Sequence, residues 1–188
     1  MIPVTTSEKS AARTAGRAAR AAGDPRAGLA LAGHVLERLS PPCGAVVAGV
    51  WPLPQEIDPR PLLLALAGRG HALALPVTGR RGTPLSFRRF RFGDPLRGGP
   101  FGTREPWPDS PELEPDWLLV PLVAFDRRGN RVGHGAGHYD ATLSALRARR
   151  RIVAVGIGYA AQQVPSVAAE PHDAPLDAVA TEAGVILP

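Results

Sequence analysis

The sequence predicts an α/β fold in which helices flank a largely parallel sheet. Short apolar runs typical of buried strands alternate along the chain with segments of helical periodicity, which is the pattern of layered α/β domains. The 188 residues contain neither an internal repeat nor a composition shift, so we expect a single domain over residues 1–188. The 21 glycines and 21 prolines predict many short, tight connections between the elements.

The N-terminal half is expected to contain three helices and two strands. Residues 8–22 carry basic side chains at intervals of four, four and three: Lys9, Arg13, Arg17 and Arg20. This spacing predicts a helix with all four on one face, and Pro25 is expected to interrupt it. The next elements in order are a helix at Ala27–Leu39, a strand at Ala45–Val50, a helix at Pro59–Leu66 and a strand at Ala72–Leu75. We expect Pro76 to end that last strand because proline cannot donate a ladder hydrogen bond.

The C-terminal half continues the alternation after an irregular stretch. Leu85–Phe92 alternates apolar and polar residues and predicts an edge strand, and the proline- and glycine-rich residues 93–115 are expected to cross the surface. Further elements are expected as strands at Trp117–Val120, Ile152–Ile157, Ala178–Thr181 and Val185–Leu187, and as a helix at 141–150. Since ligands in such folds lie beyond the carboxyl ends of strands, the loops after Val50, Val123 and Ile157 should meet at one crevice.

Composition narrows the class of protein. No run reaches the roughly 18 apolar residues of a membrane span, and the charged N-terminus lacks the apolar core of an export signal. Cys43 is the one cysteine, so no intrachain disulfide is possible and a reducing compartment is indicated. We therefore expect a cytoplasmic protein, a monomer, with no membrane partner.

The positive charge raises the question of a nucleic-acid partner. The formal net charge is +5 and the isoelectric point is near 10.5, but the basic residues are dispersed rather than gathered in one stripe. The densest run, Arg147–Arg151, ends a predicted helix, where cations complement the helix dipole. Among 22 lysines and arginines only Lys9 is lysine, which indicates a site that needs a compact, mobile ammonium. We expect no nucleic-acid partner.

The segment Leu119–Asp140 carries the strongest functional signal. A strand-like apolar run leads into glycines at 133, 135 and 137, and a helical pattern follows directly. Alternating glycines allow close approach of a ligand, and the amides at a helix start favour an anion. The spacing matches neither the dinucleotide fingerprint nor the P-loop, which needs a Gly-Lys pair. Taken alone, the segment fits a phosphate loop or a plain connection between strand and helix.

Several ordered motifs resemble the 5-formyltetrahydrofolate cyclo-ligase (5,10-methenyltetrahydrofolate synthetase) family. They are the sequence Val-Pro-Leu-Val-Ala-Phe-Asp through Gly-x-Gly-x-Tyr-Asp at 120–140, the pair Lys9 and Arg13, the proline-rich segment Trp51–Glu56, Phe101–Pro106 and the tail 172–184. The resemblance covers nearly the whole chain. It implies ATP-dependent conversion of 5-formyltetrahydrofolate to 5,10-methenyltetrahydrofolate, with ATP and Mg²⁺ as cofactors and small molecules, including polyglutamylated folates, as the partners.

The resemblance also implies the site residues. The nucleotide would be held by Lys9, Arg13, Arg131, Gly133, His134, Gly135, Ala136, Gly137, His138 and Tyr139. Lys9, Arg131 and Tyr139 would be catalytic, Trp51, Glu56, His138 and Tyr139 would bind the folate, and Asp140 and Asp173 would hold the metal. Each has a simpler interpretation too: an exposed basic helix face for Lys9 and Arg13, a helix N-cap for Asp140, core packing for Trp51 and a solvated carboxylate for Glu56.

Three positions depart from the usual pattern of the family. Members commonly carry a basic residue at the position of His134, glycine or lysine at Ala136, and an aromatic residue at His138. Neutral His134 and Ala136 offer less charge to a triphosphate than arginine or lysine would. Two other functions therefore stay open: a relative that binds folate or nucleotide without turnover and, from the isoelectric point alone, a nucleic-acid-binding protein.

Overall fold

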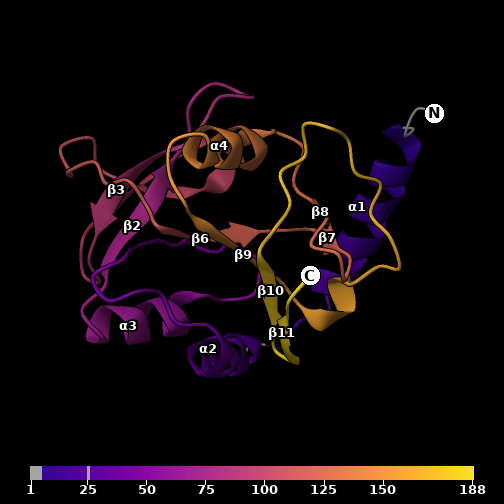
Figure 1. The fold of residues 1–188 in the computed structure, drawn as a ribbon, viewed down its shortest axis with the longest axis horizontal. Helices are drawn as coiled ribbons and strands as arrows, with labels where there is room; N and C mark the ends of the chain where they lie inside the picture. Colours follow the sequence, from indigo (N-terminus) through magenta and orange to yellow (C-terminus); the bar gives the residue numbers. More distant parts are fainter. Residues whose placement is uncertain (1–5, 25) are drawn as a thin grey trace.

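The computed structural model describes residues 6–24 and 26–188 and has a seven-stranded sheet at its centre (Figure 1). The strands are β1 (Val46–Ala48), β2 (Ala72–Val77), β3 (Ser86–Phe90), β6 (Trp117–Pro121), β9 (Val153–Ile157), β10 (Ala178–Thr181) and β11 (Gly184–Ile186). Their order is β11-β10-β9-β6-β1-β2-β3, with parallel pairing in the middle and antiparallel pairing of β11 and β3 at the two edges. The expected α/β fold with a largely parallel sheet is confirmed.

Helices cover both faces of the sheet. The α-helices of the described residues are α1 (Thr6–Arg20), α2 (Ala27–Arg38), α3 (Arg60–Gly68) and α4 (His138–Arg147). Helices α2 and α3 lie on one face and α4 lies on the other (Figure 1). Because successive strand residues point to opposite faces, Leu119 of β6 packs with Leu62 and Leu66 of α3, whereas Leu118 packs with Leu143 of α4. The apolar strand run is therefore buried on both sides.

Helix α1 lies apart from these two layers, beyond the carboxyl ends of the strands. It packs against the short hairpin of β7 (Ala124–Phe125) and β8 (Arg131–Val132) and against the 3-10 helix Ala160–Gln162. The approach is closest at Gly16, where an added Cβ would lie 2.0 Å from the carbonyl oxygen of Val123. Glycine at this position lets the helix backbone rest directly on the end of the sheet.

Some local expectations were wrong. Strand β2 continues through Pro76 to Val77. The carbonyl of Ala74 accepts from the amide of Gly49, on the side of β2 that faces β1. Pro76 faces the same side but lies past the end of β1, so its missing N–H removes no hydrogen bond between the strands. Residues 93–115 do not simply cross the surface, because β4 (Leu96–Gly98) and β5 (Arg104–Pro106) pair there around the 3-10 turn Pro100–Gly102. Pro25, expected to end the first helix, lies outside the described residues.

The start of α4 also differs from the expectation. The helix begins at His138, and its N-cap is Gly137 in the left-handed conformation. Asp140 is therefore in the first helical turn and is not the N-cap. No side chain caps this end, so the first backbone amides of α4 remain open toward the loop that precedes them.

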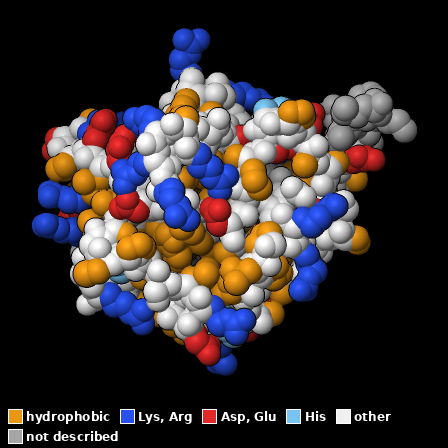
Figure 2. Space-filling view, in the orientation of Figure 1, with side chains coloured by type: hydrophobic (Ala, Val, Ile, Leu, Met, Phe, Trp, Pro, Cys, Tyr) orange, Lys and Arg blue, Asp and Glu red, His pale blue; other side chains and the backbone are white. Residues whose placement is uncertain are grey.

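The surface and the helices bear on possible partners. None of the helices formed by residues 6–24 and 26–188 has the length and apolarity needed to cross a bilayer. On the face shown in Figure 2, Lys and Arg side chains are scattered among acidic and apolar ones and do not form a single stripe.

Candidate active site

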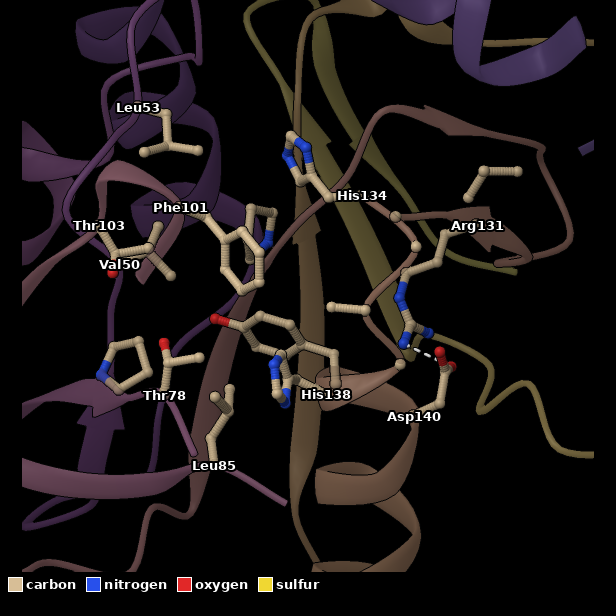
Figure 3. A pocket seen from close by; sticks show the side chains of 18 of the residues that line it. Val50, Leu53, Thr78, Leu85, Phe101, Thr103, Arg131, His134, His138 and Asp140 are labelled. Carbon is tan, nitrogen blue, oxygen red and sulfur yellow. Dashed lines mark hydrogen bonds and ion pairs between the residues drawn. The ribbon is translucent and has the colours of Figure 1, made fainter. Parts of the chain in front are cut away.

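A cavity of about 550 Å³ opens at the carboxyl ends of β1, β2 and β6. Val50 follows β1, Thr78 follows β2 and Pro121 ends β6, so three neighbouring strands deliver the floor of the cavity. Figure 3 shows Phe101 and Leu53 on one side of the space, with His134 of the glycine loop (residues 133–137) and Arg131 of β8 facing them. The basic face of α1 and residues 170–173 complete the lining.

In the backbone of the glycine loop, carbonyl groups accept hydrogen bonds from neighbouring residues while the amides are left to bind a ligand. Gly135 and Gly137 have positive φ values of 96° and 73°, which glycine adopts without strain. Arg13 Nε donates to the carbonyl of Gly133 at 3.2 Å, and Arg81 donates to that of Gly135 at 2.7 Å. Within the described part of the chain, no amide from residue 133 to 137 donates a hydrogen bond. The loop therefore offers donors to an anion at the N-terminus of α4.

Lys9 reaches this region from α1 and is held by two carboxylates. Its Nζ forms an ion pair with Glu170 and another, at 2.7 Å, with Oδ2 of Asp173. Burial lowers the pKa of Lys9, but the two carboxylates outweigh burial and leave the pKa above its usual value. Burial likewise raises the pKa of Asp173, and the hydrogen bond from Lys9 reverses that change, so its pKa lies below the usual range.

Arg131 and Asp140 form a second ion pair on the same wall. Arg131 Nη2 lies 2.7 Å from Oδ1 of Asp140 (Figure 3), and its other amino group donates to the carbonyl of Ala174. The amide of Ala174 also donates to Asp140 Oδ1, at 3.1 Å. Burial is the main cause of a lowered pKa at Arg131, although the guanidinium stays charged. This pair links the start of α4 to the C-terminal segment.

Glu56 also lines the cavity and is itself well contacted. Its Oε2 accepts from the amide of Leu53 at 2.9 Å, and its Oε1 lies 3.0 Å from Nε2 of His134 and 3.6 Å from Arg20. Burial raises the pKa of Glu56, but these hydrogen bonds and the Arg20 charge outweigh burial and hold the pKa below its usual value. Glu56 is thus an ionised carboxylate at the cavity wall, and it contacts the glycine loop through His134.

Three ring side chains line the cavity near Glu56. Burial and the Glu56 charge raise the pKa of Tyr139, so its phenol stays protonated. His138 is only 8% exposed: its Nδ1 lies 3.0 Å from the carbonyl of Thr83, while its Nε2 has no partner among the described residues. Since a carbonyl only accepts, Nδ1 carries a proton, and in the neutral tautomer that this fixes Nε2 is an acceptor. Trp51 is partly buried and has the Arg60 guanidinium 5.1 Å from its ring centre.

The acidic side chains of the cavity divide into two places. Glu170, His172 and Asp173 have ligand atoms within 4.8 Å of one another, a spacing that suits a cation. Asp140 is not in that group. Both predicted aspartates nevertheless keep one oxygen that accepts no hydrogen bond from the described residues, Oδ2 of Asp140 and Oδ1 of Asp173, the latter 3.8 Å from Nε2 of His172.

The structure brings every site residue predicted from the sequence to this one cavity. It also adds residues that the sequence interpretation missed, namely Leu53, Thr78, Arg81, Leu85, Phe101, Arg104, Glu170 and His172. The Phe-Gly motif was a usable signal for Phe101, which is 73% exposed and has a positive φ of 59°. One expectation was wrong: the loop after Ile157 lines a small neighbouring pocket with Arg20 and Glu56, not the main cavity.

Comparisons with known proteins agree on one family. The family model described as the 5-formyltetrahydrofolate cyclo-ligase family matches residues 7–182. The 5-formyltetrahydrofolate cyclo-ligase of Mycolicibacterium smegmatis is 34% identical over 73% of this chain and 74% of that protein, and that of Haemophilus influenzae is 38% identical over 49% of this chain and 51% of that protein. The solved structure of Aquifex aeolicus 5,10-methenyltetrahydrofolate synthetase aligns with a TM-score of 0.72 and 27% identity over 95% of this chain and 92% of that one.

Proposed function

Because the chain belongs to the 5-formyltetrahydrofolate cyclo-ligase family, we propose that it uses ATP to convert 5-formyltetrahydrofolate to 5,10-methenyltetrahydrofolate. Membership makes it a ligase of folate chemistry. The observation that carries the finer proposal is the shared cavity. Free amides at the start of α4, several basic side chains that include Lys9 and Arg131, and the Glu56 carboxylate all face one space of about 550 Å³.

The chemistry explains why a phosphoryl donor is needed. The oxygen of an N-formyl group is a poor leaving group. Attack of that oxygen on the terminal phosphorus of ATP releases ADP and leaves an iminium phosphate at N5. The folate N10 then adds to the activated carbon, the carbon–oxygen bond breaks with departure of inorganic phosphate, and N10 loses its proton. Such a reaction asks the protein mainly for positioning and charge neutralisation.

The nucleotide half of the cavity fits this task. We assign the triphosphate to the amides from Gly133 to Tyr139, because their carbonyls are held back by Arg13, Arg81 and the amide of Gly82. Lys9 and Arg13 supply charge from α1, and Arg131 supplies it from β8. Lys9 and Arg131 are the catalytic cations in this proposal, since both lie beside the loop where negative charge develops.

The folate half is assigned to the opposite wall. The ionised Glu56 accepts hydrogen bonds from the N–H groups of the pterin, and Trp51 packs on the flat face of the ring system. His138 Nε2 adds an acceptor, and the protonated phenol of Tyr139 adds a donor next to the formyl oxygen. Arg17, Arg81 and Arg104 at the cavity suit a polyanionic polyglutamate tail.

Magnesium is assigned to Asp140 and Asp173, and the donor set fits this ion. Mg²⁺ prefers one or two carboxylates together with phosphate oxygens, and each aspartate keeps one oxygen that accepts no hydrogen bond from the described residues. Glu170 is close enough to Asp173 to share the ion. When bound, the ion would neutralise phosphate charge. Lys9 helps to keep Asp173 ionised, and Arg131 holds the Asp140 carboxylate in place.

A direct assay tests the proposal. Purified protein is mixed with 5-formyltetrahydrofolate, ATP and Mg²⁺, and the near-ultraviolet absorbance of the methenyl product is followed together with ADP release. We expect product only when ATP is present, with ADP and product in equal amounts. Absence of product across a wide pH range would contradict the proposal.

A second candidate is a relative that binds folate or nucleotide without turnover. It is favoured by His134, which contacts Glu56, and by Ala136, which brings no charge to the loop. Binding of both ligands without product would support this alternative.

A further inference from the structure

Arg20 is a buried cation that neither the family motifs nor the cavity lining single out. It ends α1, its side chain is 8% exposed, and its Nη2 lies 3.6 Å from Oε1 of Glu56. Its Nη1 lies 3.5 Å from Nε2 of His134. A buried guanidinium is costly unless a negative group compensates it, and Glu56 is the carboxylate within reach. The two charges are therefore buried as a pair.

Glu56 needs that compensation as much as Arg20 does. Its side chain is 10% exposed, and its other contacts are a backbone amide and an imidazole. Of the groups recorded within 4 Å of this carboxylate in the described chain, Arg20 is the one with a permanent positive charge. The neighbouring phenol of Tyr139 brings no charge.

We propose that Arg20 is a positioning residue that keeps Glu56 ionised and directed into the cavity for the pterin. This inference rests on the proposed function, because it assigns the pterin to Glu56. Arg20 does not line the main cavity, so it acts through Glu56 and does not contact the substrate.

The position of Arg20 on α1 gives the pair a second consequence. The same helix carries Lys9, which pairs with Asp173, and Arg13, which holds the carbonyl of Gly133. One rigid helix thus connects the nucleotide half of the cavity to the folate half. Arg20 contacts Glu56 at the folate end of that connection, and His134 of the glycine loop contacts both Arg20 and Glu56.

The test compares the variants R20Q, R20M and R20K with R38Q, a control that loses the same charge at an exposed arginine at the end of α2. Steady-state KM is measured separately for 5-formyltetrahydrofolate and ATP, and kcat/KM for the folate is measured against pH. We expect R20Q and R20M to raise the KM for the folate about tenfold, the lower end of the range for losing one interaction with a charged group. The KM for ATP should change much less, and R20K should recover part of the loss.

The pH profile separates positioning from simple packing. Arg20 lowers the pKa of Glu56, so removing it raises that pKa, and the acid limb of the profile should move to higher pH in R20Q and R20M. The double variant R20Q/E56Q should be no worse than E56Q for folate. R38Q should match wild type in every measurement.

Each outcome decides the question. An R20Q protein with the folate KM and acid limb of R38Q overturns the inference, as does failure of both R20Q and R20M to fold, because the role would then be stability. If wild-type protein itself makes no methenyl product, the proposed function fails first, and the inference falls with it.

Discussion

Lys9 and Asp173, which are 164 positions apart in the chain, form an ion pair of 2.7 Å at the wall of the cavity. The contact joins the first helix to the segment that precedes β10, and Glu170 shares the same ammonium. The two carboxylates neutralise the buried ammonium of Lys9 until a phosphate group binds. The pair therefore places a cation and an anion where a nucleotide and its metal ion are expected to bind.

Replacing Lys9 should weaken nucleotide use. We expect K9Q to raise the KM for ATP by about tenfold or more and to lower kcat, since a charged hydrogen-bond donor to phosphate is lost. The KM for the folate should change little. Steady-state kinetics with each substrate varied in turn measures both effects. E8Q, at the adjacent exposed residue of α1, is the control, and equal effects of K9Q and E8Q would rule out a role for Lys9.

The metal assignment predicts a change in magnesium dependence. D140N and D173N should each require higher Mg²⁺ for half-maximal activity, because each removes a charged oxygen ligand. A magnesium titration of activity measures this, with D109N as the control at an exposed aspartate. If D140N alone keeps the wild-type titration curve, the ion is held by Asp173 and Glu170 and Asp140 serves only to orient Arg131.

Asp126 should matter for stability, outside the site. Its side chain is 1% exposed and accepts from the amides of Val167 and Arg128, both at 2.9 Å, and from Asn130 Nδ2 at 3.0 Å. Burial raises the pKa of Asp126, but these hydrogen bonds outweigh burial and lower it. We expect D126N to reduce the free energy of unfolding by about 1–3 kcal/mol near neutral pH.

The pH dependence of that loss has a definite sign. A lowered folded-state pKa stabilises the protein above the unfolded value of about 4, and this contribution disappears as the pH falls through the folded pKa. The difference between wild type and D126N in denaturant unfolding should therefore be largest above pH 5 and shrink below pH 4. A difference that grows on acidification would show that the carboxylate is not the stabilising group.

The contact at Gly16 predicts that α1 cannot tolerate a methyl group there. In G16A the new Cβ would meet the Val123 carbonyl, so α1 must shift and carry Lys9 and Arg20 with it. We expect kcat/KM to fall by at least about tenfold, since displacements of about 1 Å in positioning groups have effects of this size or larger. G33A is the matched control: nothing lies near that helical glycine, so alanine should raise stability by about 0.5–1 kcal/mol and leave activity unchanged.

The sequence predicted the layered fold because its signals were local. The apolar run at Trp117–Val120 is buried on both faces as expected of a central parallel strand, and the alternating Leu85–Phe92 forms the edge strand β3. The start of α4 was placed too late because aspartate is a favoured N-cap, which made Asp140 the expected N-cap. The actual N-cap is Gly137, whose backbone is left-handed. Pro76 was misread because its effect depends on where a neighbouring strand ends.

The candidate site was predicted as far as motifs reach. Ordered motifs identified Lys9, Glu56 and the glycine loop, and the structure places them around one cavity. The partners of these residues were not predictable, because the contacts of Glu170 with Lys9 and of Arg20 with Glu56 form only in the folded chain. The helical spacing placed Arg20 on the same face of the first helix as Lys9 and Arg13, but nothing in the sequence indicated that it pairs with Glu56 or that Glu170 pairs with Lys9.

The assembly of the cavity from α1, β6 and the segment at 170–173 has a consequence during synthesis on the ribosome. Helix α1 and strands β1, β2 and β3 emerge first, but β6 and β9, which complete the middle of the sheet, are made later. A nascent chain that stops before Glu170 lacks both carboxylate partners of Lys9. Ligands should consequently protect from proteolysis only those chains that have been translated past this point.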